Sequence, residues 1–485
     1  MYNKTVHRFT PATLRIIVAV LFLLPVISPM LFAQKYQPDW SSLDKRPAPA
    51  WFADAKFGIF IHWGIYSVPA YRPLERGLYA SYAEWYYAKV YNNEANGGKD
   101  FHEKNFGKDF EYRDFAPLFK AELWQPESWA KMFKDAGAQY VVLTSKHHDG
   151  YCLWPTSSPY KKNWNAMDIG PKRDLVGELA SAVRGQGLKM GLYYSIIEWE
   201  SSKTHRSETG YYVPLAVVKK YKIPENEYVD KHLLPQLYEL VTAYKPSLIF
   251  SDGGEWDSSE DSLKTKEFLA WLYNESPVKN EIVVNDRFAK GMPGRHGDYF
   301  SSEYGDANLR DGHLWEESRG IGGSYGYNRA ENLEHYSTSK QLIIELIDIV
   351  SRGGNLLLNV GPTADGTIPV IMQQRLQDIG AWLRINGEGI FESRKYLLPS
   401  EQTKQGKLYY TRKGAMLYVF FSDWPDAQLE LTVPASATVN SVSLLGVNKK
   451  IFWKQKGGKL VVTVPDCNIN KLPSVHAWTL KVELK

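Results

Sequence analysis

The sequence predicts an α/β fold: a (β/α)8-like TIM barrel, regular or irregular, followed by a C-terminal antiparallel β-sandwich. Short apolar runs bounded by Gly or Pro recur through residues 51–396, which is typical of strands buried on both faces. Stretches with a helical period lie between these runs, and such alternation indicates a parallel sheet. After residue 396 the helical period disappears and closely spaced strand-like runs follow.

Seven runs in the first region have the length and composition of strands. They are residues 57–61, 140–144, 189–192, 247–250, 282–285, 298–302 and 356–360. Seven strands favour a closed barrel in which one unit is degenerate or hidden from the pattern. An open doubly wound sheet is the alternative, but no run is followed by a Gly-rich phosphate loop.

Three stretches between these runs have the apolar spacing of amphipathic helices. Apolar residues recur at i, i+3, i+4 and i+7 from Trp129 to Ala136, and similar stripes cover residues 175–183 and 343–350. Asp174 is expected to cap the second stripe, and Gly187 follows it. These helices would cover the outer face of the barrel.

The last part of the chain predicts a separate all-β domain. Its strand-like runs are residues 408–411, 416–421, 429–433, 460–464 and 478–484. Turn residues separate them, and no catalytic group of side chains is evident. We therefore expect a catalytic domain over residues 34–396 and an accessory sandwich over residues 397–485.

Residues 1–33 differ in composition from the rest. Three basic residues precede the apolar run 16–24, and small residues follow up to Ala33. This order predicts a signal peptide cleaved near Ala33, and hence a secreted or periplasmic protein without a membrane span after cleavage. A retained membrane anchor is the alternative, but Pro25 and Pro29 interrupt the run before it reaches the roughly 20 residues needed to span a bilayer.

Composition restricts the function further. Hydrophobic residues make up 44% and charged residues 23%, as in an ordinary soluble globular protein. Loss of the three basic residues of the leader lowers the formal net charge from +4 to +1, and no basic stripe suggests nucleic acid. The two cysteines, Cys152 and Cys467, are expected to be free thiols. A homo-oligomer is left open.

Carboxylates at strand ends are the strongest catalytic candidates. Asp252 follows the apolar run 247–250 and precedes two glycines, which places it at the mouth of a barrel, where it could act as a nucleophile. A helix cap or a structural ion pair is the alternative role, and Glu255 is a weaker rival. Glu303 follows the run 298–302 and could supply the second carboxyl of a glycosidase; Glu316 and Glu198 are its rivals.

Histidines follow two other strand-like runs. His62 follows the first run, and His147 and His148 follow the second. Metal binding through His147, His148 and Asp149 is one interpretation, but no H-x-H or H-E-x-x-H spacing supports it. Hydrogen bonding to substrate hydroxyls suits neutral imidazoles better, because each offers one donor and one acceptor. Arg287 could orient a carboxylate or lie on the surface.

Six segments, in chain order, resemble the α-L-fucosidases of glycoside hydrolase family 29. They are 54–64 (DAKFGIFIHWG), 82–86 (YAEWY), 145–150 (SKHHDG), 170–175 (GPKRDL), 285–287 (NDR) and 353–362 (GGNLLLNVGP). The resemblance covers about residues 40–396, and the sandwich matches the usual C-terminal domain of that family.

The resemblance implies hydrolysis with retention through a covalent fucosyl-enzyme, without a metal or an organic cofactor. It places the nucleophile at Asp252 and the acid/base at Glu303. The positions expected to contact the sugar are His62, Tyr82, Glu84, His147, His148, Tyr193, Arg287 and, as an aromatic wall near the fucose methyl group, Tyr325.

Some positions depart from the family pattern. Phe250 stands where a tryptophan is common two residues before the nucleophile, and the segment between Arg287 and Glu303 is longer than in some relatives. The expected substrate is a fucosylated oligosaccharide or glycoconjugate. A retaining glycosidase for a related sugar, such as an α-galactoside, and a non-catalytic glycan-binding protein remain the alternatives.

Overall fold

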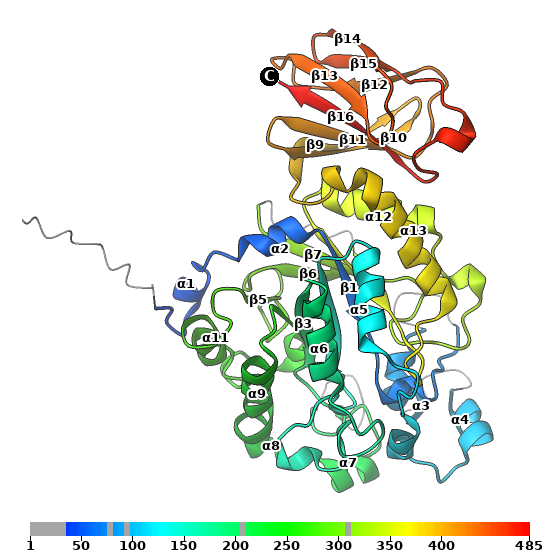
Figure 1. The fold of residues 1–485 in the computed structure, drawn as a ribbon. Helices are drawn as coiled ribbons and strands as arrows, with labels where there is room; N and C mark the ends of the chain where they lie inside the picture. The colour runs from blue at the N-terminus through cyan, green and yellow to red at the C-terminus, as the bar shows by residue number, and fades with distance from the viewer. Residues whose placement is uncertain (1–34, 75–80, 92–97, 204–209, 306–311) are drawn as a thin grey trace, which may run out of the picture. The chain divides into compact units, whose positions relative to one another are not determined.

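Eight parallel strands form one curled sheet in the computed structural model, which describes residues 35–74, 81–91, 98–203, 210–305 and 312–485 (Figure 1). The strands are β1 (Phe57–Ile61), β2 (Tyr140–Lys146), β3 (Lys189–Ser195), β4 (Leu248–Asp252), β5 (Val283–Val284), β6 (Phe300–Glu303), β7 (Trp315–Gly320) and β8 (Asn355–Val360). This confirms the predicted barrel-type fold. The predicted signal peptide lies outside the described residues.

The sheet order is β5-β4-β3-β2-β1-β8-β7-β6, so β1 lies near the middle and pairs with both β2 and β8. Strands β5 and β6 lie at the two ends of this order, and no ladder joins them within the described part of the chain. The barrel is therefore irregular at one seam. The segment between these two strands, residues 285–299, contains no helix.

Most of the strands are buried on both faces, as the apolar runs predicted; in β6 only Phe300 is fully buried. Inward-facing residues pack together inside the curled sheet: Phe60, Tyr140, Val142, Tyr193, Leu248, Phe250, Val283 and Leu357. Their neighbours in the chain, such as Ile59, Val141 and Ile249, belong to a second cluster shared with the helices. Gly58 faces the inside, and a Cβ there would come within 2.4 Å of the Tyr140 ring. Large aromatic side chains therefore fill the interior.

Helices cover the outer face of the sheet (Figure 1). The longer ones are α4 (Gly98–Phe106), α5 (Pro126–Asp135), α6 (Leu175–Gly185), α9 (Leu234–Tyr244), α11 (Thr265–Asn274), α12 (Ser339–Ser351) and α13 (Val370–Asn386). The domain also has shorter helices, among them α10 at the mouth of the barrel: α1 (Trp40–Leu43), α2 (Ala50–Ala55), α3 (Tyr86–Tyr91), α7 (Leu215–Tyr221), α8 (Glu225–Glu227) and α10 (Gly254–Asp257). None of the described helices is long and apolar enough to cross a membrane.

The three predicted amphipathic helices are confirmed as α5, α6 and α12. Asp174 caps α6 as expected, because its Oδ1 accepts a hydrogen bond from Gly177 N at 2.9 Å. Thr338 caps α12 in the same way. These caps fix where each helix begins, and the strand that follows each helix begins a few residues after its end.

The C-terminal strands form two antiparallel sheets with their own apolar core, as predicted. They are β9 (Arg394–Thr403), β10 (Gly406–Lys413), β11 (Met416–Phe421), β12 (Gln428–Thr432), β13 (Val439–Leu444), β14 (Phe452–Lys456), β15 (Lys459–Thr463) and β16 (Trp478–Leu484). Helices α12 and α13 contact this domain, and Trp382 Nε1 of α13 donates to Ala477 O at 2.9 Å. No disulfide joins Cys152 and Cys467, both of which are free.

Candidate active site

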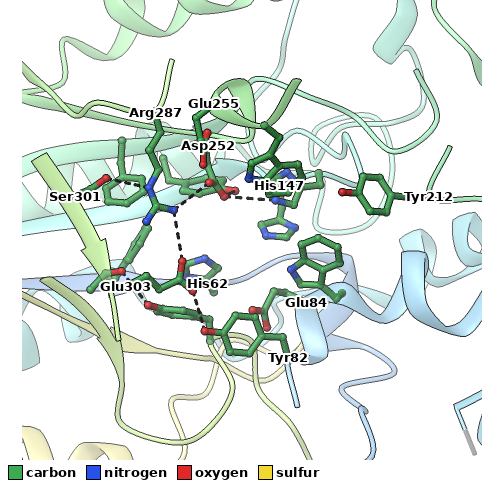
Figure 2. Close-up of a pocket in the computed structure, with 18 of the residues that line it drawn as sticks. His62, Tyr82, Glu84, His147, Tyr212, Asp252, Glu255, Arg287, Ser301 and Glu303 are labelled. Carbon is green, nitrogen blue, oxygen red and sulfur yellow. Dashed lines mark hydrogen bonds and ion pairs between the residues drawn. The ribbon is translucent and has the colours of Figure 1, made fainter. Parts of the chain in front are cut away.

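A cavity of about 710 Å³ lies where the barrel strands end (Figure 2). Its lining includes every side chain that the sequence predicted to be catalytic or to bind substrate. These are His62, Tyr82, Glu84, His147, His148, Tyr193, Asp252, Arg287, Glu303 and Tyr325. Strands β1, β2, β3, β4 and β6 carry most of them at or near their carboxyl ends, so segments far apart in the chain share one site.

Asp252 is the last residue of β4 and accepts several polar contacts. The hydroxyl of Tyr193 donates to Oδ2 at 2.7 Å, and His148 Nε2 lies 3.4 Å from the same oxygen. Arg287 Nη1 lies 3.3 Å from Oδ1. Burial alone would raise the pKa of Asp252, but His148, Arg287 and Tyr193 outweigh it and hold that pKa well below its usual value. The carboxylate is therefore ionised at neutral pH.

Glu303 is the last residue of β6 and lies across the cavity from Asp252 (Figure 2). Tyr82 donates its hydroxyl hydrogen to Oε1 at 2.8 Å, and Arg287 Nη1 lies 3.4 Å from Oε2. Burial raises the pKa of Glu303 above its usual value; Arg287 counters part of this shift, and the charge of Asp252 adds to it. The two carboxyl groups therefore differ in their tendency to hold a proton.

A single nitrogen, Nη1 of Arg287, contacts both carboxyl groups. This nitrogen lies 3.3 Å from Asp252 Oδ1 and 3.4 Å from Glu303 Oε2. The two oxygens are therefore no more than 6.7 Å apart. Retaining glycosidases hold their carboxyl groups about 5–5.5 Å apart, and inverting ones about 6.5–9.5 Å. This upper limit excludes most of the carboxyl separations found in inverting glycosidases.

Two further side chains fix the Arg287 guanidinium. Its Nε donates to Ser301 Oγ at 2.9 Å, and that hydroxyl donates to Asp286 Oδ1 at 2.7 Å. The same Asp286 oxygen accepts from Ser301 N at 2.9 Å. Asp286 follows β5 and Ser301 belongs to β6, so this chain of hydrogen bonds crosses the seam of the barrel.

The hydrogen bonds of His62 define which of its ring nitrogens carries a proton. Asn359 Nδ2 donates to Tyr325 O at 2.7 Å, so the Asn359 Oδ1 that lies 2.7 Å from His62 Nδ1 must accept. Burial lowers the pKa of His62 to about 4, which makes the ring neutral at pH 7. Its Nδ1 therefore carries the proton, and Nε2 is left as an acceptor.

His147 and His148 both face the cavity because β2 ends at Lys146, before either residue. Their ring centroids lie 4.3 Å apart. Burial holds the pKa of His147 well below its usual value, and the neighbouring His148 and His62 lower this pKa further. His148 Nδ1 lies 2.6 Å from Ser195 Oγ, whose hydroxyl donates to Ile197 O, so His148 donates from Nδ1.

Glu84 and Tyr325 complete the predicted set. Glu84 Oε2 accepts from Gly326 N at 2.8 Å, and burial raises the pKa of Glu84 to about 7. The hydroxyl of Tyr325 lies 2.9 Å from Ser318 Oγ, while its ring lies 4.8 Å from the His62 ring. Aromatic faces and hydrogen-bonding groups thus line the same cavity, as sugar binding requires.

Two of the three rival carboxyl groups lie outside the cavity. Glu316 accepts a hydrogen bond from Tyr140 within the barrel, and neither Glu316 nor Glu198 lines the cavity. Glu198 instead forms buried ion pairs with Lys146 and Lys161. Glu255 does line the cavity.

Several lining residues were missed by the sequence-based prediction. They include Arg72, Trp85, Lys89, Tyr212, Trp256, Asp286, Ser301 and Ser318. Trp85 and Trp256 belong to aromatic–acidic clusters that the sequence did mark, whereas Arg72 and Tyr212 lie in loops with no motif. Asp286 is adjacent to Arg287, but no pattern in the sequence indicated its contact with Ser301.

No group of three or more His, Cys, Asp or Glu side chains within the described ranges is arranged to hold a metal ion. His148 contacts Asp252 and Ser195 instead. Both ring nitrogens of His148 thus face protein side chains.

A parallel barrel with two carboxyl groups across one cavity, whose pKa values are shifted in opposite directions, is the arrangement of a glycoside hydrolase. Comparison with known proteins agrees. The α-L-fucosidase family model matches residues 26–388, and the α-L-fucosidase C-terminal domain model matches residues 401–483. The chain belongs to the α-L-fucosidase family.

Individual relatives resemble the chain over nearly its whole length. It is 41% identical to the tissue α-L-fucosidase of Rattus norvegicus over 453 residues, 92% of each chain. It is 39% identical to the human tissue α-L-fucosidase over 455 residues, 93% of this chain and 92% of the human one. The crystal structure of Thermotoga maritima α-fucosidase in complex with fucose superposes with a TM-score of 0.78 at 39% identity, covering 92% of this chain and 100% of that one.

Proposed function

We propose that this protein is an exo-acting α-L-fucosidase that hydrolyses terminal α-L-fucose from glycans or glycoconjugates with retention of configuration. The observation that carries the proposal is the Arg287 bridge, which keeps Asp252 Oδ1 and Glu303 Oε2 no more than 6.7 Å apart, below most of the separations found in inverting enzymes. The family membership of the chain supports fucose as the sugar.

In the first step an ionised Oδ of Asp252 attacks the anomeric carbon, and the bond from that carbon to the leaving oxygen breaks. Glu303, whose raised pKa favours its protonated form, gives its proton to the leaving oxygen. The products are a covalent fucosyl-enzyme and the free aglycone. The unlike environments of the two carboxyl groups make both protonation states available at one pH.

In the second step Glu303, now ionised, takes a proton from water as the water oxygen attacks the anomeric carbon. The bond to Asp252 breaks, and the carboxylate returns to its hydrogen bonds with Tyr193 and Arg287. Two inversions at the same carbon give net retention.

The remaining lining residues suit a 6-deoxy sugar. His62 offers an acceptor at Nε2, and Glu84 offers a carboxyl group for ring hydroxyls. The rings of Phe60, Phe250 and Tyr325 form an apolar wall that can contact a methyl group. A C6 hydroxyl against these rings would lose its hydrogen bonds to water.

The decisive experiment compares nitrophenyl α-L-fucoside with nitrophenyl α-galactoside. We expect the fucoside to be the better substrate by kcat/KM. A preference for the galactoside would reverse the assignment, and binding of fucosides without turnover would indicate a glycan-binding protein. Loss of activity on chelation, restored by a divalent ion, would instead indicate a metal-dependent hydrolase.

The role of Asp252 predicts a specific rescue. Asp252→Gly should abolish turnover, and azide should restore part of it as a fucosyl azide, because the small anion replaces the missing nucleophile. The measurement is product analysis with and without azide, with the wild-type enzyme in azide as the control. Full activity of Asp252→Gly in the absence of azide would remove the nucleophile from this position.

The role of Glu303 predicts a dependence on the leaving group. Glu303→Ala should lose more activity on a substrate with a poor leaving group than on the nitrophenyl substrate, because only the former needs a proton from the enzyme. Glu316→Gln, which alters a buried carboxyl group outside the cavity, is the matched control. Equal losses on both substrates would contradict the acid role.

The composition of residues 1–33 supports an exported protein, secreted or periplasmic, with cleavage of a signal peptide near Ala33. The near-neutral charge that remains does not favour nucleic-acid binding. N-terminal sequencing of the protein recovered from its cellular fraction tests this part of the proposal.

A further inference from the structure

Glu255 is a cavity-lining carboxyl group that the mechanism above does not use. It belongs to the short helix α10, three residues after Asp252, and both side chains lie on the same side of the cavity (Figure 2). Its Oε2 is buried and has no hydrogen-bond partner among the residues that the structure describes. A buried polar atom without a partner at the wall of a substrate cavity is suited to meet a group of the ligand.

The backbone around Glu255 is held tightly. Gly253 has φ of 81°, in the left-handed region that favours glycine. A Cβ on Gly254 would come within 2.1 Å of Phe288 O and 3.0 Å of Arg287 O, so α10 lies directly against that backbone. Glu255 therefore keeps a fixed position relative to both Asp252 and Arg287.

The charges around Glu255 favour its protonated form. Arg287 forms ion pairs with Asp252 and Glu303, and no ion pair with Glu255 is found within the described residues. Burial raises the pKa of Glu255 to about 8, and the negative charge of Asp252 adds to this increase. The charge of Asp286 also raises the pKa, whereas that of Arg287 lowers it. Tyr193 is a further titratable side chain that faces Glu255. At neutral pH the group is a carboxylic acid, which can donate a hydrogen bond.

The position of Asp252 limits which substrate hydroxyl Glu255 can reach. The anomeric carbon must lie against the attacking Oδ of Asp252, and the leaving oxygen must face Glu303. The hydroxyl nearest to the anomeric carbon is the one on C2, and hydrogen bonds to this hydroxyl strengthen in glycosidase transition states.

We propose that Glu255 is a substrate-binding residue whose carboxyl group donates a hydrogen bond to the 2-hydroxyl of the fucosyl ring. The proposal rests on the proposed fucosidase function. It assigns to Glu255 a role that neither Asp252 nor Glu303 can fill, because both of these carboxyl groups are engaged with the bond that breaks.

The experiment compares the wild-type enzyme with Glu255→Ala and Glu255→Gln on nitrophenyl α-L-fucoside and its 2-deoxy analogue, with spontaneous hydrolysis subtracted. Glu255→Ala should lower kcat/KM on the fucoside by about 10- to 100-fold, the effect of losing one hydrogen bond in the transition state. On the 2-deoxy substrate the same variant should match the wild type within about threefold, because there is no bond left to lose.

Glu255→Gln keeps a donor and should retain most of the activity on the fucoside at pH 6. Because an amide does not ionise, the plot of kcat/KM against pH for this variant should no longer show an ionisation near pH 8 on its alkaline side. Glu316→Gln, a buried carboxyl group outside the cavity, should change neither the fucoside to 2-deoxyfucoside ratio nor this ionisation.

Equal losses of Glu255→Ala on both substrates would overturn the assignment to the 2-hydroxyl. A Glu255→Gln variant as impaired as Glu255→Ala on the fucoside would overturn the donor role. Both outcomes differ from failure of the proposed function itself, in which the wild-type enzyme would not hydrolyse the fucoside.

Discussion

Removal of the Tyr193 hydroxyl separates the two chemical steps of the proposed mechanism. Tyr193 lies on the inner face of β3, and its hydroxyl donates to Asp252 Oδ2 at 2.7 Å. Its ring centroid lies 5.9 Å from that of Phe60 and 6.0 Å from that of Phe250. Tyr193→Phe deletes one oxygen and keeps this packing, so the ring should stay in place.

The two steps depend on this hydrogen bond in opposite ways. Attack by Asp252 converts a carboxylate into an ester and consumes the charge that the hydroxyl stabilises. Release of fucose regenerates the charge, so the donor assists the second step. A hydrogen bond to a charged group contributes about 1.5–3 kcal/mol, and its loss should slow the second step by about 10- to 150-fold.

Stopped-flow measurement of nitrophenol release tests this reasoning. Tyr193→Phe should show a burst of about one equivalent per active site, and kcat and KM should fall together as the fucosyl-enzyme accumulates. Tyr194→Phe is the matched control, because the next residue of β3 faces outward and donates to Gln236 at 2.9 Å. A lower kcat at unchanged KM and without a burst would refute the argument.

Two further predictions concern Ser301, at the wall of the cavity, and Glu316, a buried carboxyl group outside it. Ser301→Ala removes the acceptor for Arg287 Nε, and freer motion of the guanidinium should lower kcat/KM by about tenfold. Both limbs of the pH profile should move upward, since Arg287 lowers the pKa of Asp252 and of Glu303. Unchanged limbs would contradict this, and Ser276→Ala, a buried serine outside the cavity, is the control. Burial raises the pKa of Glu316 to about 8, so the folded state binds more protons than the unfolded state between the usual pKa of a glutamate, about 4.3, and pH 8. This group should therefore lower the free energy of unfolding by about 1.4 kcal/mol per pH unit in that range. Between pH 5 and pH 8 the free energy of unfolding, measured with urea, should fall less in Glu316→Gln than in the wild type. An equal difference in this free energy between variant and wild type at both pH values would contradict the burial argument.

The sequence predicted most of the barrel because its strands are apolar on both faces. Strand β7 was missed, since residues 315–320 read Trp-Glu-Glu-Ser-Arg-Gly and contain only one apolar side chain. Glu316 and Glu317 are nevertheless buried, with hydrogen bonds from Tyr140 and from Arg319. A strand that is stabilised by buried polar pairs leaves no apolar pattern to detect.

The candidate site was predictable where a strand end carries its own polar residue. Asp252, Glu303 and His62 lie at or just beyond the ends of predicted strands, so the common direction of a parallel sheet brings them together. Tyr212 and Arg72 reach the cavity from loops, whose course depends on contacts distant in sequence. Those contacts cannot be inferred from a local pattern.

The irregular seam of the barrel and the geometry of the site have a common origin. Strand β5 contains only Val283 and Val284, and within the described residues no ladder continues to β6. Backbone and side-chain hydrogen bonds take the place of that ladder. Asp298 N and Tyr299 N donate to Val284 O, Asp298 Oδ2 accepts from Val284 N, and Asp286 Oδ1 accepts from the backbone and the hydroxyl of Ser301. Because Ser301 also accepts from Arg287, the bonds that close the seam hold the guanidinium between the two carboxyl groups. A regular ladder would satisfy the backbone of β6 without Asp286, so the short strand is what brings this side chain into contact with the active site.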